Sequence, residues 1–513
     1  MFPTLEEVTQ IAASGDYRMV PAAKELLADR FTPIEVMRTL RAHSDHAFLL
    51  ESAEQDQRWG RWTFLADSPL LEITCADGRL RIREGYREGH VTETVTECEH
   101  PGAAVREVLA RFKSPKVEGL PPFTGGLVGY FAYDYIKYAE PTLKLTAPED
   151  RDFLDMDLML FDTVIAFDHY RQKVLLIGNV DVSGAAEGND GAAAGADTRD
   201  GCIARAYADT EARLNELAEL LKNGPKYDFP QLVLKEDLTP RFSAEEYGEM
   251  VGKARRYIRE GDIFQVVLSD PLTAAAEGSL FDTYRVLRSM NPSPYMFYFN
   301  SDDVEIAGAS PETLVKLEDG VLNTFPLAGT RPRGKTEKED RELERELLAD
   351  EKERAEHNML VDLGRNDIGR IAKLGTVKVD KYMVIERFSH VMHIGSTVSG
   401  EIREDRDAVD AVDAILPAGT LSGAPKLRAC EIIQELEGVK RGIYGGAIGY
   451  LDFTGNLDTC ISIRLAYKKN GRVCVQSGAG IVADSVPEKE FIECQNKAGA
   501  VVNALRTAAG GVE

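Results

Sequence analysis

The sequence predicts an α+β fold, because it combines hairpin-like strand signals, long helical segments and a length beyond one ordinary core. Short apolar runs separated by polar turns, such as "HAFLLES" and "RWTFLAD", are typical of strands in hairpins. Helical periodicity recurs elsewhere, for instance in "IARAYADTEARLNELAELLKN". With 513 residues, we expect either two to four domains or one large fused body.

The chain divides into three segments. Residues 1–182 carry most of the hairpin signals, including "LLEITCADGRLRIRE" and "GGLVGYFAYDYI". Residues 183–241 begin with a Gly- and Ala-rich stretch, 183–201, that predicts a flexible surface insertion, and continue as a helix and an irregular connector. Residues 242–505 mix helices and strands: "EKEDRELERELLADEKERAEHNMLVDLGRND" (337–367) predicts one long charged helix, and "CISIRLAYKK" and "RVCVQSGAGIV" predict adjacent strands.

The charge balance argues against nucleic-acid and membrane partners. Asp and Glu number 85 against 61 Lys and Arg, a formal net charge of −24, and no dense basic patch offsets it. An anionic substrate would therefore need a local Arg, Lys or metal ion. Seven scattered cysteines without a CxxC pair suit a reduced, cytoplasmic compartment. No secretory signal and no run of about 18 apolar residues is present.

Two pairs of glutamates share a three-residue spacing. Glu353 and Glu356 lie on one helical face, and on this stretch alone a solvated, salt-bridged surface explains that pair better than a ligand site does. The apolar residues in "AEHNMLVDL" suggest that this helix enters the core, where a carboxylate must be paired, protonated or metal-bound. Glu490 and Glu493 repeat the spacing. Together the two pairs would offer all-oxygen ligands suited to Mg²⁺ or Mn²⁺, provided that they meet.

Glycine-rich turns offer anion contacts, although each is also readable as an ordinary tight turn. "PLAGTRPRG" and "PAGTLSGAPK" would present backbone amides with the hydroxyls of Thr330 and Thr420, and neither is a P-loop. "GAGIVA" (478–483) matches a dinucleotide fingerprint, but Pro487 follows soon and no second strand ending in Asp or Glu comes after it. We therefore reject a Rossmann fold and retain only glycine amides that can bind a carboxylate.

Two further side chains are candidates for the same site. Arg464 falls in the middle of an apolar strand-like run, where it is costly without a carboxylate partner. His393 lies on a predicted strand, where a lone histidine is more often a satisfied core residue than a catalytic one. His393 is a candidate catalytic residue only if it faces the same cavity as the other residues.

These motifs together resemble the chorismate-utilising enzymes, and within them the anthranilate synthase large subunits. The resemblance covers most of 242–505 and rests on the following motifs: "GDIFQVVLS", "GASPE", "PLAGTRPRG", "KERAEHNMLVDLGRND", "SHVMH", "PAGTLSGAPK", "RGIYGGAIGY", "ISIRLAY", "SGAGIVADSVPEKE" and "NKA". The N-terminal half matches more loosely, through "LLES" and "RWTFLADSP".

The resemblance implies a fold and an activity. The fold would be a large two-subdomain α/β sandwich of antiparallel sheets with flanking helices. The chain would convert chorismate and ammonia to anthranilate and pyruvate through aminodeoxyisochorismate, the first committed step of tryptophan biosynthesis. The ammonia would come from a separate glutaminase subunit, because no cysteine here stands in G-x-C-x-G. A heterotetramer of two large and two small subunits and feedback inhibition by L-tryptophan would follow.

The resemblance also assigns roles to individual residues. Mg²⁺ would be held by Glu356 and Glu493, with support from Glu353 and Glu490. The substrate carboxylates would be bound by Gly329, Thr330, Tyr444, Arg464, Gly478, Ala479 and Gly480. Catalysis would use Glu312 as general acid, His393 as base, Thr420 to orient the intermediate, and Gln265. Tryptophan would contact Glu51, Ser52, Pro294, Tyr295 and Met296.

Two positions distinguish the branches of the family. Isochorismate and salicylate synthases carry a water-activating Lys where this chain has Gln265, and aminodeoxychorismate synthases carry Lys where it has Ala328. Both differences favour ammonia as nucleophile and anthranilate as product. Gly395, where the family usually has a β-branched residue, and Ala66, where Gly is usual, depart from the pattern. Two alternatives remain: aminodeoxychorismate synthase component I, and a tryptophan-binding regulator without catalysis.

Overall fold

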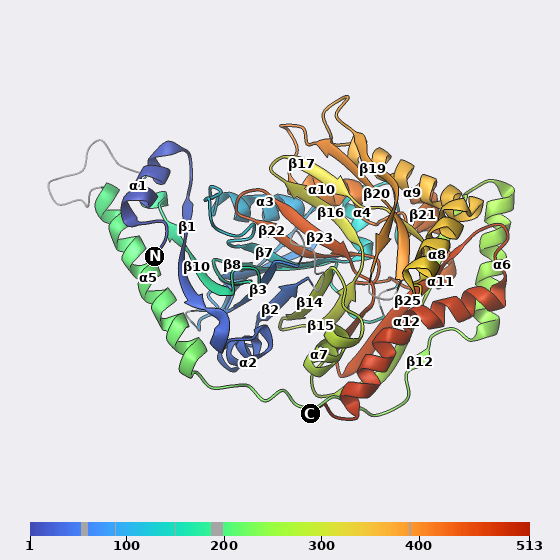
Figure 1. Ribbon diagram of the computed structural model, residues 1–513, viewed down its shortest axis with the longest axis horizontal. Helices are drawn as coiled ribbons and strands as arrows, with labels where there is room; N and C mark the ends of the chain where they lie inside the picture. The colour runs from blue at the N-terminus through green and yellow to red at the C-terminus, as the bar shows by residue number, and fades with distance from the viewer. Residues whose placement is uncertain (53–59, 88, 149, 186–198, 389–390, 513) are drawn as a thin grey trace.

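Two large antiparallel sheets form the body of the molecule, and helices flank them (Figure 1). The computed structural model describes residues 1–52, 60–87, 89–148, 150–185, 199–388 and 391–512. Within these residues one sheet has 13 strands, the other has 12, and the α+β fold expected from the sequence is confirmed. Of the expected insertion, residues 186–198 lie outside the described part, and 199–201 already belong to a long helix.

The strand orders are as follows. The 13-stranded sheet runs β1 (Met19–Leu27), β10 (Lys173–Asp181), β9 (Thr163–Asp168), β3 (Trp62–Asp67), β2 (Ala47–Glu51), β14 (Tyr295–Asn300), β15 (Glu305–Ser310), β24 (Leu465–Lys469), β25 (Arg472–Ile481), β13 (Gln265–Glu277) and β11 (Val233–Leu234), with β12 (Thr239–Pro240) and β21 (Gly423–Ala424) also paired to β13. The 12-stranded sheet runs β18 (Leu327–Pro332), β20 (Val391–Glu401), β17 (Val321–Thr324), β16 (Thr313–Glu318), β23 (Leu457–Ile461), β22 (Ala447–Asp452), β7 (Gly126–Phe131), β8 (Met156–Phe161), β4 (Leu71–Ala76), β5 (Arg79–Glu84) and β6 (Thr92–Glu97), with β19 (Lys378–Arg387) on β20.

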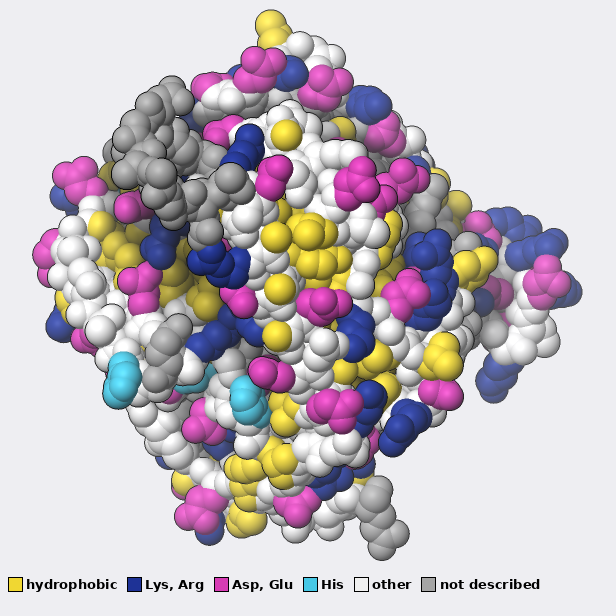
Figure 2. Space-filling view, turned by 90° about the vertical axis from the view of Figure 1, so that its left-hand side faces the viewer, with side chains coloured by type: hydrophobic (Ala, Val, Ile, Leu, Met, Phe, Trp, Pro, Cys, Tyr) yellow, Lys and Arg dark blue, Asp and Glu magenta, His cyan; other side chains and the backbone are white. Residues whose placement is uncertain are grey.

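The helices in the described residues are α1 (Leu5–Ser14), α2 (Pro33–His43), α3 (Gly102–Ala110), α4 (Ile136–Ala139), α5 (Arg199–Asn223), α6 (Ala244–Glu260), α7 (Phe281–Met290), α8 (Glu337–Ala349), α9 (Glu351–Gly369), α10 (Ala408–Ile415), α11 (Lys426–Glu437) and α12 (Pro487–Ala509). None of these is both long enough and apolar enough to cross a membrane. On the face that carries α1 and α5, Lys and Arg side chains lie interspersed with Asp and Glu (Figure 2).

The two halves of the chain repeat one topology. In the 13-stranded sheet β2 pairs with β14, and outward from this pair the orders β2-β3-β9-β10-β1 and β14-β15-β24-β25-β13 correspond. In the other sheet β7 pairs with β22, again at the junction of the halves. The strands at that junction share the pattern G-G-x-x-G-Y, in "GGLVGYF" (125–131) and "GGAIGYL" (445–451). Each half therefore supplies strands to both sheets, around a common junction.

The predicted single helix over 337–367 is wrong: the chain forms α8 and α9 with a break at Asp350. The Asp350 backbone is extended, and its carboxylate accepts hydrogen bonds from the amides of Lys352, at 3.0 Å, and Glu353, at 3.2 Å. Such an N-cap satisfies amides that a helix start leaves without partners. The break lets α9 begin as a separate helix at the edge of a polar cavity.

Two of the points at which the chain passes from one sheet to the other are neighbours. β15 and β16 are joined across the sheets by Pro311 and Glu312, and β23 and β24 by residues 462–464. The Ile461 amide donates to the Glu312 carbonyl at 2.9 Å, and the Ala309 amide donates to the Arg464 carbonyl at 3.1 Å. Arg464 therefore lies in a connection, with a left-handed φ of 52°, and its expected place in mid-strand is wrong.

A fully buried ion pair joins the elements behind these connections. Arg441 is 1% exposed, and its guanidinium donates to both Glu437 carboxylate oxygens, at 2.9 and 2.5 Å. It also donates to the carbonyls of Leu421 and Val267, each at 2.6 Å. The Ser269 amide completes the set by donating to Glu437 at 2.8 Å. One pair thus fixes α11, β13 and the loop before β21 relative to one another.

Breaking this pair on one side should be far more damaging than replacing both members. We expect Arg441→Met to lower the free energy of unfolding by about 3–5 kcal/mol, because it leaves the Glu437 carboxylate buried without its cation. The double variant Arg441→Met, Glu437→Leu should recover most of that loss, since no unpaired charge remains. Urea unfolding of the three proteins measures both effects. A double variant less stable than Arg441→Met would contradict this account.

Candidate active site

A polar cavity of about 560 Å³ lies against α9, α12 and the ends of β13, β18, β20 and β25. It collects almost all residues that the sequence singled out for catalysis, substrate binding and metal binding. These are Gln265, Glu312, Gly329, Thr330, Glu353, Glu356, His393, Thr420, Tyr444, Arg464, Gly478, Gly480, Glu490 and Glu493. Ala479 is the exception: its side chain is buried in an apolar cluster, so only its backbone is available to a ligand.

Glu312 presents a carboxyl group at the cavity wall. It stands at the crossing between β15 and β16, and its carboxylate accepts a hydrogen bond from the Thr420 hydroxyl at 3.2 Å. Withdrawal of the carboxyl from solvent raises its pKa to about 7, although Thr420, Arg464 and Lys497 each act to lower it. A substantial fraction of this side chain therefore carries a proton at neutral pH.

His393 on β20 is a second titratable side chain at the cavity wall. Its Nδ1 lies 2.8 Å from the carbonyl oxygen of Gly329. A carbonyl only accepts, so this bond puts the proton on Nδ1 and leaves the Nε2 lone pair available. Burial lowers the pKa of His393, while the bond to Gly329 opposes the change and Arg464 adds to it. The imidazole is therefore neutral at physiological pH.

Cationic side chains line a cavity that is otherwise rich in carboxylates. Burial lowers the pKa of Arg464, and Glu312 opposes that shift. Lys352 and Lys497 also line the cavity, and sequence reasoning missed both as site residues. Helical spacing would have found them, because Lys497 follows Glu493 by four residues and Lys352 precedes Glu356 by four. These cations supply the local positive potential that an anionic ligand needs in a chain of net charge −24.

The glycines of β25 let its backbone approach the cavity closely. β25 pairs with β24 only over Arg472–Val475, whereas it pairs with β13 as far as Ile481. In the described residues no strand pairs with the remaining edge of β25. A Cβ at Gly478 would lie 2.6 Å from the Leu268 carbonyl oxygen and 3.0 Å from the Tyr444 hydroxyl, so a larger residue does not fit.

The four glutamates meet at this cavity, two from α9 and two from α12. Burial, followed by repulsion from Glu353, raises the pKa of Glu356; burial and repulsion from Glu493 raise that of Glu490. Glu493 is exposed at the mouth, 2.8 Å from the Lys497 ammonium. Within the described residues no three His, Cys, Asp or Glu side chains are close enough to enclose a metal ion. The oxygen donors fit Mg²⁺ in its usual mode, with one or two carboxylates and other ligands from water or substrate.

Gln265 distinguishes this chain from other branches of the resembled family, and Gly395 departs from the family's usual residue. Gln265 is 6% exposed, and its amide oxygen is buried without a hydrogen-bond partner among the described residues. It stands at the cavity wall as an unused acceptor. At Gly395 a Cβ would lie 2.7 Å from Glu386 Cγ, so the β19 side chain occupies the space that a β-branched residue would need.

A smaller cavity of about 110 Å³ brings together the residues expected to contact tryptophan: Glu51, Ser52, Pro294, Tyr295 and Met296. Glu51 accepts a hydrogen bond from Arg288 Nε at 2.6 Å. The Tyr295 hydroxyl donates to Asp458 at 2.8 Å and lies 2.9 Å from the Thr313 hydroxyl. Thr313 directly follows Glu312 in the chain. The contact between Tyr295 and Thr313 therefore links a residue of the smaller cavity to the residue next to Glu312.

Comparison with curated proteins and solved structures gives a consistent result. The chain is 46% identical over 507 residues to an anthranilate synthase component 1 of Acetivibrio thermocellus, covering 99% of both chains. A crystal structure of anthranilate synthase component I from Streptococcus pneumoniae TIGR4 matches with a TM-score of 0.73 and 38% identity, over 86% of this chain and 92% of that one. The menaquinone-specific isochorismate synthase of Escherichia coli, at 19% identity and a TM-score of 0.65 over 98% of each chain, shares the fold.

The family resemblance expected from the motifs is thereby confirmed. A model of chorismate binding enzymes matches residues 45–503, which include strands β2 to β25 and all residues that line the polar cavity. The chain belongs to the chorismate-binding enzymes.

Proposed function

We propose that the chain forms anthranilate and pyruvate from chorismate and ammonia, as the large subunit of an anthranilate synthase. One observation carries the proposal: a protonated carboxyl, Glu312, and a neutral imidazole, His393, face one cavity that also holds the cationic Arg464 and four glutamates. The 46% identity to a protein of that name supports the same activity.

The first step needs an acid. Ammonia forms a bond to C2 of the ring while the bond from C4 to its hydroxyl breaks, and the hydroxyl takes a proton from Glu312 and leaves as water. The product nitrogen then loses its extra proton to solvent or to the ionised Glu312. The unpartnered amide oxygen of Gln265 is suited to accept an N–H of the entering ammonia. Gln265, in place of a water-activating lysine, supports ammonia as nucleophile, and Ala328 supports anthranilate as product.

The second step needs a base. His393 takes the proton from C2 of aminodeoxyisochorismate, and the electrons of that C–H bond complete the aromatic ring as the bond from C3 to the enolpyruvyl oxygen breaks. The released enolate takes a proton at its methylene carbon and becomes pyruvate. The Nδ1 bond to Gly329 fixes the imidazole tautomer for this transfer. Thr420, whose hydroxyl donates to Glu312, orients the intermediate between the two groups.

The carboxylates of chorismate are bound by cations and backbone amides. Arg464, Tyr444 and the Thr330 hydroxyl lie around the cavity, together with the backbone at Gly329, Gly478, Ala479 and Gly480. Glu356 and Glu493 would hold Mg²⁺ with support from Glu353 and Glu490, and a bound Mg²⁺ would neutralise the ring carboxylate. Lys352 and Lys497 temper the repulsion among these glutamates.

Two partners complete the proposal. A separate glutaminase supplies ammonia, and the two kinds of subunit assemble as a heterotetramer; the relatives' name, component 1, supports a second component. L-Tryptophan inhibits the enzyme by binding the cavity of Glu51, Ser52, Pro294, Tyr295 and Met296. The hydrogen-bonded contact from Tyr295 to Thr313, beside Glu312, gives this inhibitor a short connection to the acid.

One assay tests the function against its alternatives. Purified chain with chorismate, Mg²⁺ and high ammonium at mildly alkaline pH should release anthranilate, measured by its fluorescence, and added L-tryptophan should suppress it. Aminodeoxychorismate without pyruvate would instead assign the other synthase. Tryptophan binding without turnover would assign a regulator. Either result rejects the proposed function.

The pH dependence should report Glu312. At constant free ammonia, kcat/KM for chorismate should fall above pH about 7, approaching tenfold per unit, because the free enzyme then loses the proton that Glu312 must donate. Glu312→Gln should lower kcat roughly 10²–10⁴-fold. Glu351→Gln, at the exposed start of α9, is the control and should leave the rate unchanged. A wild-type profile that stays flat to pH 9 would remove Glu312 as the acid.

His393→Met should separate the two steps. Ring amination should continue, since it does not use the imidazole, and pyruvate release should fail, so that aminodeoxyisochorismate accumulates. Chromatography of the products and a coupled pyruvate assay measure the two outcomes. The exposed His43→Met serves as control. Unimpaired anthranilate formation by His393→Met would exclude His393 from the mechanism.

A further inference from the structure

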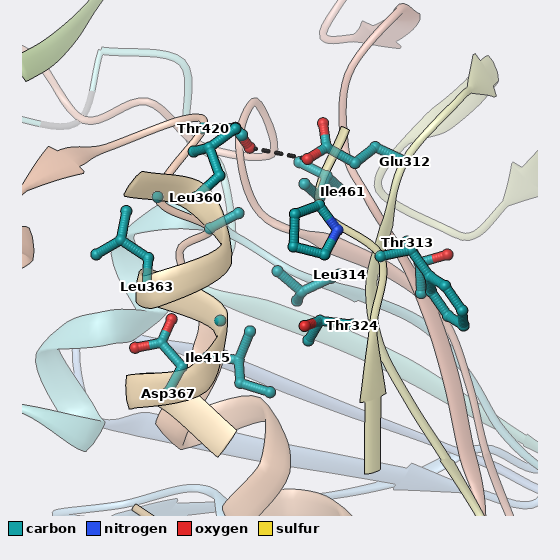
Figure 3. A pocket seen from close by; sticks show the side chains of 15 residues that line it. Glu312, Thr313, Leu314, Thr324, Leu360, Leu363, Asp367, Ile415, Thr420 and Ile461 are labelled. Atoms are coloured by element: carbon teal, nitrogen blue, oxygen red, sulfur yellow. Dashed lines mark hydrogen bonds between the residues drawn. The ribbon is translucent and has the colours of Figure 1, made fainter. Parts of the chain in front are cut away.

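A small interior chamber lies directly behind the Glu312 carboxyl (Figure 3). Its volume is about 50 Å³, above the roughly 10–15 Å³ that one water molecule requires. Glu312, Leu360 and Thr420 line both this chamber and the polar cavity, so these side chains form the partition between the two. The rest of the wall comes mainly from α9, from β16 and β17, and from the loop before β21.

The chamber wall is mostly apolar but carries a hydroxyl group with no protein partner. Thr324 on β17 is 7% exposed, and its Oγ1 is buried without a hydrogen bond among the described residues. A buried hydroxyl left without any partner is unfavourable, and such groups in native proteins usually bind an ordered water. Figure 3 shows the Thr324 hydroxyl directed into the space between β17 and α9.

Carboxyl groups at both ends of the chamber supply the remaining partners. Glu312 lies at one end, and Asp367 of α9, which is 5% exposed and lies 2.9 Å from the Lys426 ammonium, lies at the other. A buried water typically makes two to four hydrogen bonds. Thr324, Glu312 and Asp367 together provide that number, whereas the leucines around them provide none.

We propose that the chamber holds ordered water that hydrogen-bonds the Thr324 hydroxyl to the rear of the Glu312 carboxyl, which makes Thr324 a positioning residue for the acid. This inference deepens the proposed function and rests on the role given there to Glu312. The water donates to the carboxylate from behind while the Thr420 hydroxyl donates from the side of the loop. The carboxyl is thereby held in one orientation toward the polar cavity.

The sign of the effect follows from the direction of the hydrogen bond. Water that donates to Glu312 favours the ionised form, as do Thr420, Arg464 and Lys497, while burial favours the protonated form. Without the chamber water the protonated form of Glu312 becomes more favourable relative to the ionised form. The alkaline limb of kcat/KM should therefore move to higher pH in a variant that loses the water.

The test compares pH profiles of four variants with the wild type. Thr324→Val keeps the shape and removes the hydroxyl, and should shift the alkaline limb upward by about 0.4–1 pH unit. Gly364→Ala, whose Cβ would lie 3.0 Å from Thr324 Oγ1, fills the chamber and should shift the limb the same way. Thr324→Ser keeps a hydroxyl and should restore the wild-type profile.

Thr283→Val is the matched control. Thr283 on α7 is also fully buried with an unpartnered hydroxyl, but it lines neither cavity. Its removal should leave the profile unchanged, and thermal unfolding should verify that all variants are folded. An unshifted limb in Thr324→Val, or an equal shift in Thr283→Val, would overturn the proposal.

A crystal structure separates this inference from the proposed function. We expect water density between Thr324 and Glu312 in the wild type and none in Thr324→Val. Ordered water in an enzyme that makes no anthranilate would leave the chamber assignment standing and reject the proposed function. A wild-type chamber without water in an active enzyme would reject this inference alone.

Discussion

The buried pair of Arg441 and Glu437 is the constraint on which the polar cavity depends. Its guanidinium bonds three separate pieces of chain: α11 through Glu437, β13 through Val267, and the loop carrying Thr420 through Leu421. β13 and that loop form part of the cavity wall, and the pair ties both to α11. Two charges withdrawn from water are tolerated only when every polar atom around them is satisfied, so the pair admits few arrangements of its neighbours. The pair of Arg441 and Glu437 therefore fixes the geometry of the cavity wall from the side that faces away from the cavity.

The front of the cavity is shaped by the exchange of strands between the sheets. A strand that leaves one sheet for the other must turn, and at the turn its side chains are released from the alternation of the pleat. Glu312 and Arg464 occupy two such turns, and their carbonyls accept hydrogen bonds from the amides of Ile461 and Ala309, respectively. An acid and a cation are thus held close together on rigid connections. This is the placement that precise chemistry requires of its reacting groups.

Sequence reasoning recovered what is local and missed what depends on distant partners. The spacing of Glu353 with Glu356 is a property of one helix turn, and it was readable without the fold. The run around Arg464 reads as one strand because nothing in its apolar neighbours reveals that they belong to two sheets. The break at Asp350 was hidden because a capping aspartate looks like any other acid in a charged run. The strand order and the interior chamber arise from long-range pairing, which no local pattern records.

The repeated topology gives the molecule a seam. The two halves of the chain meet where β2 pairs with β14 and where β7 pairs with β22. The smaller cavity lies at this junction, and it is lined by Glu51 and Trp62 from one half and by Tyr295 and Tyr450 from the other. A molecule bound in this cavity contacts both halves at once. Its affinity then depends on how the halves sit against each other, and by reciprocity it biases that alignment. The repeated topology thus provides a site where one bound molecule can influence the alignment of both halves.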